Sequence, residues 1–436
     1  MTEKGWIILK STIVSHQGVE ISKIIAKRLQ DIEHIQYVLG RKYNQSLSRG
    51  QAEWSMSSLA DGLPGVILLF SEWSKVEPDS DWGEYIYNIL IFLHRHNSIL
   101  MPDISLFSGT TGIAYALRVA AEATGGYSTI IRQLNDHILS VLENWLQSMH
   151  VRPSKLNEAD LSQYDVISGF SGIGRYLLEA DADPRAQKIA ELLVADISHF
   201  VNSCVLPFFF DRAMPCNNNQ LPLGIAHGIG GMLCFLLLSY KRNIQVPGLL
   251  ETIQCLTECM SQQVQEDRFG LYWPETISSL NQPDCSSNNI GRTIEGWCHG
   301  SLGMALTIWR AGECLHEEKY KELSVKVAYS AFQFRERELE LFPPTFCHGL
   351  SGLLYLSNLF YRHTSNIDAQ YFAEQVATRL VNMYEKSFPY GYKDWDVGRE
   401  TDNIGLLQGA SGIALSLLDF GLNSVDIKWH EPFLVY

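Results

Sequence analysis

The stretch CHGSLGMALTIW, residues 298–309, joins two glycines spaced Gly-x-x-Gly to an apolar segment two to three helical turns long. The same pattern occurs seven times, at intervals of roughly fifty to seventy residues, which is typical of a repeat architecture. The seven copies are DGLPGVILLF (61–70), FSGTTGIAYAL (107–117), ISGFSGIGRYLL (167–178), AHGIGGMLCFLL (226–237), CHGSLGMALTIW (298–309), CHGLSGLLYLS (347–357) and QGASGIALSLL (408–418).

Amphipathic stretches lie between these copies, with apolar residues recurring every three or four positions. Examples are TIIRQLNDHILSVLENWLQSM (129–149), RAQKIAELLVADIS (185–198), KYKELSVKVAYSAFQF (319–334) and DAQYFAEQVATRLVNMYEK (368–386). This period predicts helices with one buried face. We therefore expect an all-α fold, an α/α toroid of seven inner and seven outer helices, because closing the ring leaves no end repeat uncapped.

The toroid should form one domain over residues 1–436, with the repeats at about 55–420. Strand signals are few: IILKSTIV (7–14) and CVLPFFF (204–210). In each repeat, the first glycine should supply a positive φ and the second a close approach of neighbouring backbones. All seven loops should lie on one rim, and in most of them the glycines serve packing alone.

The amino-acid composition and charge restrict the classes of protein to which the chain can belong. The formal net charge is −14, with 48 acidic and 34 basic residues, which argues against a nucleic-acid partner. The nine cysteines are an odd number and begin only at Cys204, so we expect free thiols in a reducing cytoplasm rather than a disulfide framework. The N-terminus lacks the features of a secretory signal, and no uninterrupted apolar run is long enough to span a bilayer.

Four of the seven repeats carry chemically distinctive residues on the expected rim. Cys298 and Cys347 each stand two residues before the first glycine of a repeat, and a histidine follows each of them. Two thiolates and one imidazole form a three-ligand set that leaves the fourth zinc position open. The alternative is that these cysteines are small buried apolar residues, and chemistry alone does not choose between His299 and His348 as the nitrogen ligand.

Two further residues complete the set on the rim. His227 directly precedes the first glycine of the fourth repeat, and Asp165 stands four residues before that of the third. Histidine is the natural proton carrier near neutral pH. His227 could instead be a satisfied loop residue, and Asp165 an acceptor that caps the following turn.

The sequence resembles the lanthionine synthetase C-like (LanC) peptide cyclases over about residues 55–420. The resemblance rests on YDVISGFSGIG (164–174), GIAHGIGG (224–231), GWCHGSLG (296–303), FCHGLSGLL (346–354) and GLLQGASGIALSLL (405–418). Members of this family form a toroid of seven inner and seven outer helices and hold a zinc ion (Zn2+) through two cysteines and a histidine. The resemblance therefore implies Cys298, Cys347 and His348 as zinc ligands, His227 as the catalytic histidine and Asp165 as its acidic partner.

The sequence departs from the family pattern at one position. Some members have an arginine four residues before the first cysteine ligand, where this chain has Ile294, and Arg292 lies two residues further away. Some members also carry a small β-rich insertion resembling an SH2 domain. Residues 204–222 and 267–296 are the candidates for such an insertion here.

The activity implied by the resemblance is addition of cysteine thiols to dehydroalanine or dehydrobutyrine of a dehydrated precursor peptide, giving thioether rings. The chain should be a stand-alone cyclase in the cytoplasm, working with a separate dehydratase and an ABC exporter at the membrane. One alternative is a zinc-containing LanC-like protein that binds peptide or glutathione without forming a ring. A zinc-free α/α-toroid glycosidase is a second alternative, but it would need paired carboxylates in the cavity mouth.

Overall fold

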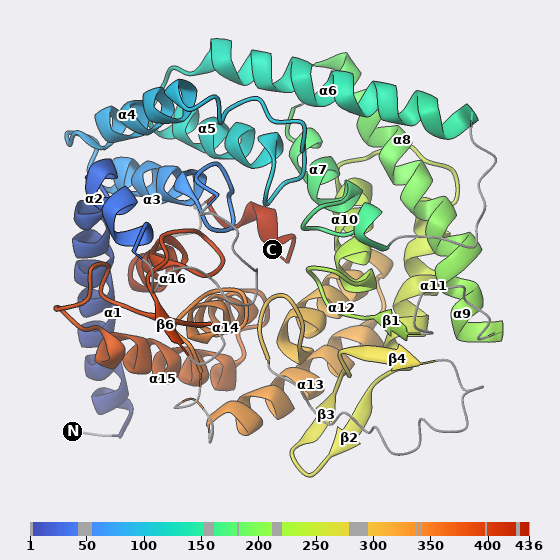
Figure 1. Ribbon diagram of the computed structural model, residues 1–436. Helices are drawn as coiled ribbons and strands as arrows, with labels where there is room; N and C mark the ends of the chain where they lie inside the picture. Colours follow the sequence, from blue (N-terminus) through green and yellow to red (C-terminus); the bar gives the residue numbers. More distant parts are fainter. Residues whose placement is uncertain are drawn as a thin grey trace. The chain divides into compact units, whose positions relative to one another are not determined.

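The computed structural model is mainly helical (Figure 1). It describes residues 3–41, 55–151, 161–180, 183–211, 220–278, 295–336, 339, 342–396, 399–423 and 428–435. The chain divides into two compact units. Unit 1 comprises residues 1–103, 107–134 and 335–430, and unit 2 comprises residues 104–106, 135–334 and 431–436.

Unit 1 is built around four apolar helices, α3, α5, α14 and α16. α3 packs against α4 and α5, α14 packs against α15, and α16 packs against α14, α3 and the N-terminal helix α1. The elements of this unit are α1 (Glu3–Arg28), α2 (Ile32–Leu39), α3 (Leu63–Val76), α4 (Trp82–Arg95), α5 (Thr110–Thr124), α14 (Leu350–Thr364), α15 (Ile367–Met383), α16 (Ala410–Leu422), β5 (Asp394–Asp396) and β6 (Arg399–Thr401).

Unit 2 is built around three apolar helices, α7, α10 and α12. α7 packs against α8, and α10 packs against α7, α11 and α12. The elements of this unit are η3 (Leu161–Gln163), α7 (Phe170–Leu177), α8 (Pro184–Phe200), η4 (Val201–Val205), α9 (Leu206–Asp211), β1 (Gln220–Pro222), α10 (Ile229–Lys241), α11 (Leu249–Ser261), β2 (Gln265–Asp267), β3 (Gly270–Tyr272), β4 (Thr276–Ser278), α12 (Ser301–Leu315) and η7 (Glu431–Phe433). Two helices cross the boundary between the units in sequence, α6 (Ser128–Val151) and α13 (Glu318–Glu336).

The repeat pattern in the sequence corresponds to real helices. Each Gly-x-x-Gly segment starts an apolar helix, and the first glycine is the N-cap residue in every case. In α10, for example, all residues from Ile229 to Leu237 are buried, whereas α11 buries only one face. The predicted alternation of a buried and a half-buried helix is therefore present within each unit.

The prediction for the first glycines was wrong at six of the seven positions. Only Gly300 has a positive φ, 116°, and the other six have φ between −103° and −133°. At five of these six the constraint is space, since a Cβ at Gly62, for instance, would lie 2.5 Å from the carbonyl oxygen of Met56 in its own loop; the others are Gly169, Gly228, Gly349 and Gly409. Tight packing of the loop under the helix, rather than backbone freedom, requires glycine there.

Both predicted strand segments are helical. IILKSTIV lies inside α1, which packs along α16. CVLPFFF begins in η4 and continues into α9, so it lies at the end of a helical stretch that runs from Pro184 to Phe209. Tertiary packing overrides the local β preference of these apolar, β-branched and aromatic runs.

The described strands form three two-stranded antiparallel sheets. β1 pairs with β4 and β2 with β3 in unit 2, and β5 pairs with β6 in unit 1. The segments considered for an SH2-like insertion thus contribute β1, β3 and β4, while residues 212–219 and 279–294 lie outside the described residues. An inserted domain stays a prediction.

One helical stretch of the described residues, Pro184–Phe209, is long and apolar enough to cross a membrane by length and composition. More than half of its apolar window, 56%, is buried inside the protein. A core helix passes the same test, and α8 uses its apolar face to pack against α7. The stretch is therefore weak evidence for a membrane span.

Candidate active site and metal ligands

Backbone hydrogen bonds align three repeat loops of unit 2. Val166 N donates to Ala226 O and Ala226 N donates to Cys298 O, both at 3.1 Å. Gly224 allows this approach, because a Cβ there would lie 2.5 Å from the Cys298 carbonyl oxygen. The loops that carry Asp165, His227 and Cys298 therefore lie side by side, although more than one hundred residues of sequence separate the first from the last.

Asp165 and His227 are in direct contact. The Asp165 side chain is 1% exposed and its Oδ2 lies 2.7 Å from Nδ1 of His227. Its other oxygen, Oδ1, accepts hydrogen bonds from Ser168 N at 2.7 Å and Gly169 N at 2.9 Å. The carboxylate thus fixes the histidine ring and caps the turn into α7 at the same time, so the two interpretations of Asp165 are compatible.

The environment of His227 suits a group that exchanges protons. Its side chain is 66% exposed, so the ring is accessible from solvent. The hydrogen bond to Asp165 raises the pKa of His227 above its usual value, and partial burial opposes this rise. When Nδ1 carries the proton donated to Asp165, Nε2 has a free lone pair and can accept a proton from another molecule.

Cys298 lies in the adjoining loop of the same unit. The residue is 8% exposed, and its Sγ lies 3.1 Å from Nδ1 of His299. This contact raises the pKa of His299. His299 therefore contacts the thiol of Cys298, the residue that precedes it in the sequence.

Glu295 is a site residue that the sequence analysis missed. It is 1% exposed, and its Oε2 accepts hydrogen bonds from Ser301 N at 2.5 Å and Leu302 N at 3.3 Å. The carboxylate closes the loop around Cys298 and caps the positive N-terminal end of α12. An acidic residue a few positions before the first glycine, as with Asp165, was the signal that could have revealed it.

Cys347 and His348 lie in unit 1, on the loop before α14. Cys347 N donates to Leu407 O at 2.9 Å, and Leu407 N donates to Ala60 O at 2.8 Å. Both Cys347 and His348 are half-buried. The preceding residue, Phe346, is fully buried, so the loop is anchored while its two polar side chains keep partial access to solvent.

The donor set on these loops fits zinc. The seven described cysteines, Cys298 and Cys347 among them, are thiols rather than halves of a disulfide, while Cys216 and Cys285 lie outside the described residues. Thiolate sulfur and imidazole nitrogen are ligands that zinc accepts, whereas magnesium and calcium require oxygen. Ile294 and Arg292, where the family pattern is broken, also lie outside the described residues.

Fold and site together define a helical repeat protein with a histidine–aspartate pair whose histidine is on a loop that lies beside the loop of Cys298. The family model described as "Lanthionine synthetase C-like protein" matches residues 53–434, so the chain belongs to the lanthionine synthetase C-like family. The chain is 22% identical over 394 residues to the nisin biosynthesis protein NisC of Lactococcus lactis subsp. lactis, a match that covers 87% of this chain and 89% of NisC.

Comparison with solved structures agrees with this assignment. Nisin cyclase superposes with a TM-score of 0.70 at 20% sequence identity, covering 89% of this chain and 94% of that protein. The match shows that the chain has the nisin cyclase fold. The predicted all-α class, the α/α toroid of this family, is therefore confirmed.

Proposed function

We propose that the protein is a zinc-dependent lanthipeptide cyclase. It adds cysteine thiols of a dehydrated precursor peptide to dehydroalanine or dehydrobutyrine and forms lanthionine or methyllanthionine rings. Membership of the lanthionine synthetase C-like family and the likeness to NisC and nisin cyclase support this activity. The contact between Asp165 and His227, beside the Cys298 loop, is the observation that carries the mechanism.

The proposed zinc ligands are Cys298, Cys347 and His348, which are a buried thiol, a half-buried thiol and a half-buried imidazole. When bound, zinc would lower the pKa of an incoming substrate thiol so that it reacts as a thiolate. His299 is left to contact Cys298, as the structure shows.

His227 is the proposed proton carrier. Its Nε2 accepts the proton of the substrate thiol, the sulfur bonds to the β-carbon of the dehydro residue, and the electron pair of the double bond moves to form an enolate. His227 then returns the proton to the α-carbon, which completes a mass-neutral addition. Asp165 holds the ring in the required tautomer and stabilises its protonated form.

The chemistry of the substrate implies an earlier enzyme. A peptide that carries dehydroalanine or dehydrobutyrine has already lost water from serine or threonine, so a dehydratase must act first. We propose that the cyclase works in the cytoplasm with a dehydratase and an ABC exporter, at the membrane where the exporter is located.

The test combines metal analysis with ring formation. Purified protein should contain about one zinc per chain, and Cys298→Ala or Cys347→Ala should lose it. A dehydrated peptide with one cysteine should lose its free thiol without a change in mass. His227→Ala should keep zinc but lose this activity, and Cys255→Ala, which removes an exposed free thiol on α11, is the matched control.

The outcomes separate the candidate functions. Zinc without thiol consumption would favour a LanC-like protein that binds peptide or glutathione and forms no ring. Retained ring formation in His227→Ala would refute the proton-carrier role, and a protein without zinc would refute the metal site.

A further inference from the structure

The C-terminal segment, residues 428–435, is well buried. Its apolar side chains are almost fully enclosed: Trp429 and Val435 are each 1% exposed, Phe433 is 0% and Leu434 is 5% exposed. Residues 428–430 belong to unit 1, and residues 431–435 belong to unit 2. Residues 428–430 are therefore part of the core of unit 1, and residues 431–435 are part of the core of unit 2.

In unit 1 the segment packs against the residue that precedes Cys347. The ring of Trp429 meets the ring of Phe346 edge to face, with centroids 5.7 Å apart at 82°. Trp429 also packs against Tyr355 at 5.3 Å, and the hydroxyl of Tyr355 lies 2.7 Å from Nδ1 of His430. Phe346 is fully buried and directly precedes Cys347, so the segment packs against the residue next to this thiol.

In unit 2 the segment packs in the same way against the residue that precedes Cys298. The ring of Phe433 meets that of Trp297 at 4.9 Å and 70°, and Trp297 Nε1 donates to Phe433 O at 3.0 Å. Trp297 is fully buried. A single segment of eight residues thus supports both cysteine loops through an aromatic neighbour of each thiol.

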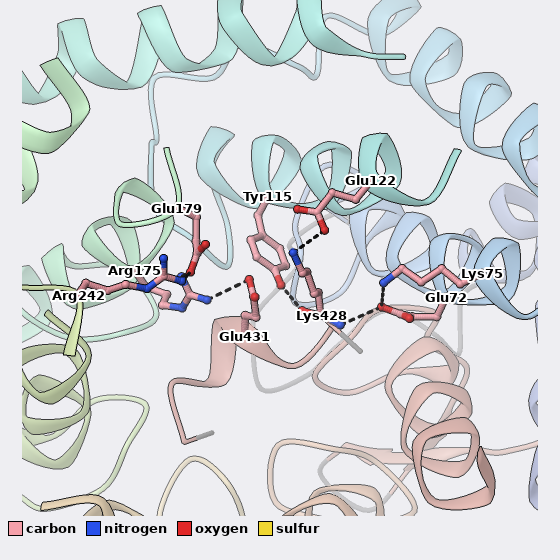
Figure 2. Close-up of polar contacts among 9 residues, drawn as sticks. All are labelled: Glu72, Lys75, Tyr115, Glu122, Arg175, Glu179, Arg242, Lys428 and Glu431. Carbon is pink, nitrogen blue, oxygen red and sulfur yellow. Dashed lines mark hydrogen bonds and ion pairs between the residues drawn. The ribbon is translucent and has the colours of Figure 1, made fainter. Parts of the chain in front are cut away.

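Polar contacts hold the first part of the segment in unit 1 (Figure 2). Lys428 N donates to Glu72 Oε1 at 3.1 Å, and its carbonyl oxygen accepts from the hydroxyl of Tyr115. The Lys428 ammonium pairs with Glu122 at 2.7 Å. Glu72 is itself 3% exposed, so the backbone at Lys428 is anchored to a buried group.

A second network holds the part of the segment in unit 2 (Figure 2). Glu431 pairs with Arg175 at 2.9 Å, and Arg175 also pairs with Glu179 at 2.9 Å. The side chain of Arg175 is 1% exposed and that of Glu431 is 12% exposed. Breaking a pair buried to this degree is costly, because it leaves an uncompensated charge in the core.

We propose that the C-terminal segment is a positioning element for the two cysteine loops, with Trp429 acting on Cys347 and Phe433 acting on Cys298. The proposal rests on the proposed function for its effect on zinc, but its effect on the two thiols can be measured without metal. Neither residue touches the reacting atoms. Each acts through the buried aromatic residue that precedes the cysteine.

The first arm of the test measures thiol reactivity in the full-length protein after zinc has been removed with a chelator. Iodoacetamide labelling, followed by proteolysis and mass spectrometry, gives a rate for each cysteine. Phe433→Ala should accelerate labelling of Cys298 and leave Cys347 unchanged, and Trp429→Ala should do the reverse. Cys234, which is 4% exposed on α10, reports global unfolding and should label slowly in both variants.

The second arm measures zinc affinity by competition with a chromophoric chelator. Each variant should bind zinc about 10- to 100-fold more weakly, the range found when supporting residues around a metal are removed. The conservative variants Phe433→Leu and Trp429→Phe should restore most of the affinity. Leu256→Ala, which removes a fully buried side chain from α11, is the control for general destabilisation and should keep wild-type affinity.

The outcomes distinguish this proposal from the zinc proposal. Unchanged labelling of Cys298 and Cys347 in the two alanine variants would overturn the positioning role, as would equal acceleration of all cysteines, Cys234 included. A wild-type protein that binds no zinc, but whose variants still show the residue-specific labelling, would overturn the metal site and leave the positioning role standing.

Discussion

Replacing Asp165 with asparagine separates the two tasks of this carboxylate. Asparagine has the same shape, and its Oδ1 can still accept the hydrogen bonds from Ser168 N and Gly169 N. Its other atom, Nδ2, carries hydrogens and can only donate toward Nδ1 of His227. The substitution therefore preserves the turn into α7 but favours the tautomer in which Nε2 is protonated, so the ring can no longer accept the thiol proton.

The expected effects of Asp165→Asn on the cyclisation rate and on stability follow from these contacts. Loss of a correctly protonated acid–base group costs about 10²- to 10⁴-fold in rate, which corresponds to about 2.7–5.4 kcal/mol of transition-state stabilisation. The stability cost should be small, below about 1.5 kcal/mol, because both hydrogen bonds to the backbone are kept. Asp165→Ala should cost more stability, since it leaves the buried amide of Gly169 and the amide of Ser168 without their acceptor.

The assay is single-turnover cyclisation of a dehydrated peptide with one cysteine, with the remaining free thiol counted after alkylation. Zinc content and a denaturant titration on the same samples serve as controls. An Asp165→Asn protein that keeps zinc and stability but cyclises at the wild-type rate would refute the tautomer argument. A variant that unfolds or loses zinc would show that the carboxylate is needed for the loop rather than for proton transfer.

Three further predictions follow from the described contacts. The pKa of His227, followed by NMR, should lie above about 6.5 and should fall in Asp165→Asn. A raised pKa stabilises the folded state below about 6.5, and this contribution is lost as pH rises through the folded pKa. The wild type should therefore exceed the variant in stability by more at pH ~5.5 than at pH ~8.5. Gly224→Ala should lower the free energy of unfolding, measured by urea titration, by about 1–3 kcal/mol, since its Cβ would lie 2.5 Å from the Cys298 carbonyl oxygen. The control Gly83→Ala, whose Cβ would lie 3.4 Å from Thr124, should not lower stability. Arg362→Ala should lower the free energy of unfolding by about 3–5 kcal/mol, because the Asp419 carboxylate, 3% exposed and 3.0 Å from Arg362, loses its cation. Burial already raises the pKa of Asp419, so the loss of stability should become smaller as pH falls. Equal losses at low and neutral pH would contradict this explanation.

Much of the helical framework could be predicted because its signals are local. An apolar run with a 3.6-residue period specifies a buried helix wherever it lies in the chain, and a glycine pair marks its start. The strands predicted at residues 7–14 and 204–210 were wrong. Their apolar β-branched and aromatic residues are typical of strands, but both segments are helical. Propensity was the weaker influence there, because packing of a long helix buries more surface than a short strand without a partner.

By itself, the sequence determined the seven glycine-led helices and the identities of the residues that can bind metal or carry protons. Only the tertiary structure decided how those residues are oriented: Asp165 contacts His227, and the C-terminal segment packs against Trp297 and Phe346, the residues that precede the two cysteines. The physical reason is that helix periodicity is fixed by neighbours three or four residues apart. Orientation is fixed by contacts between loops and core segments that lie from sixty to more than one hundred residues apart in the chain.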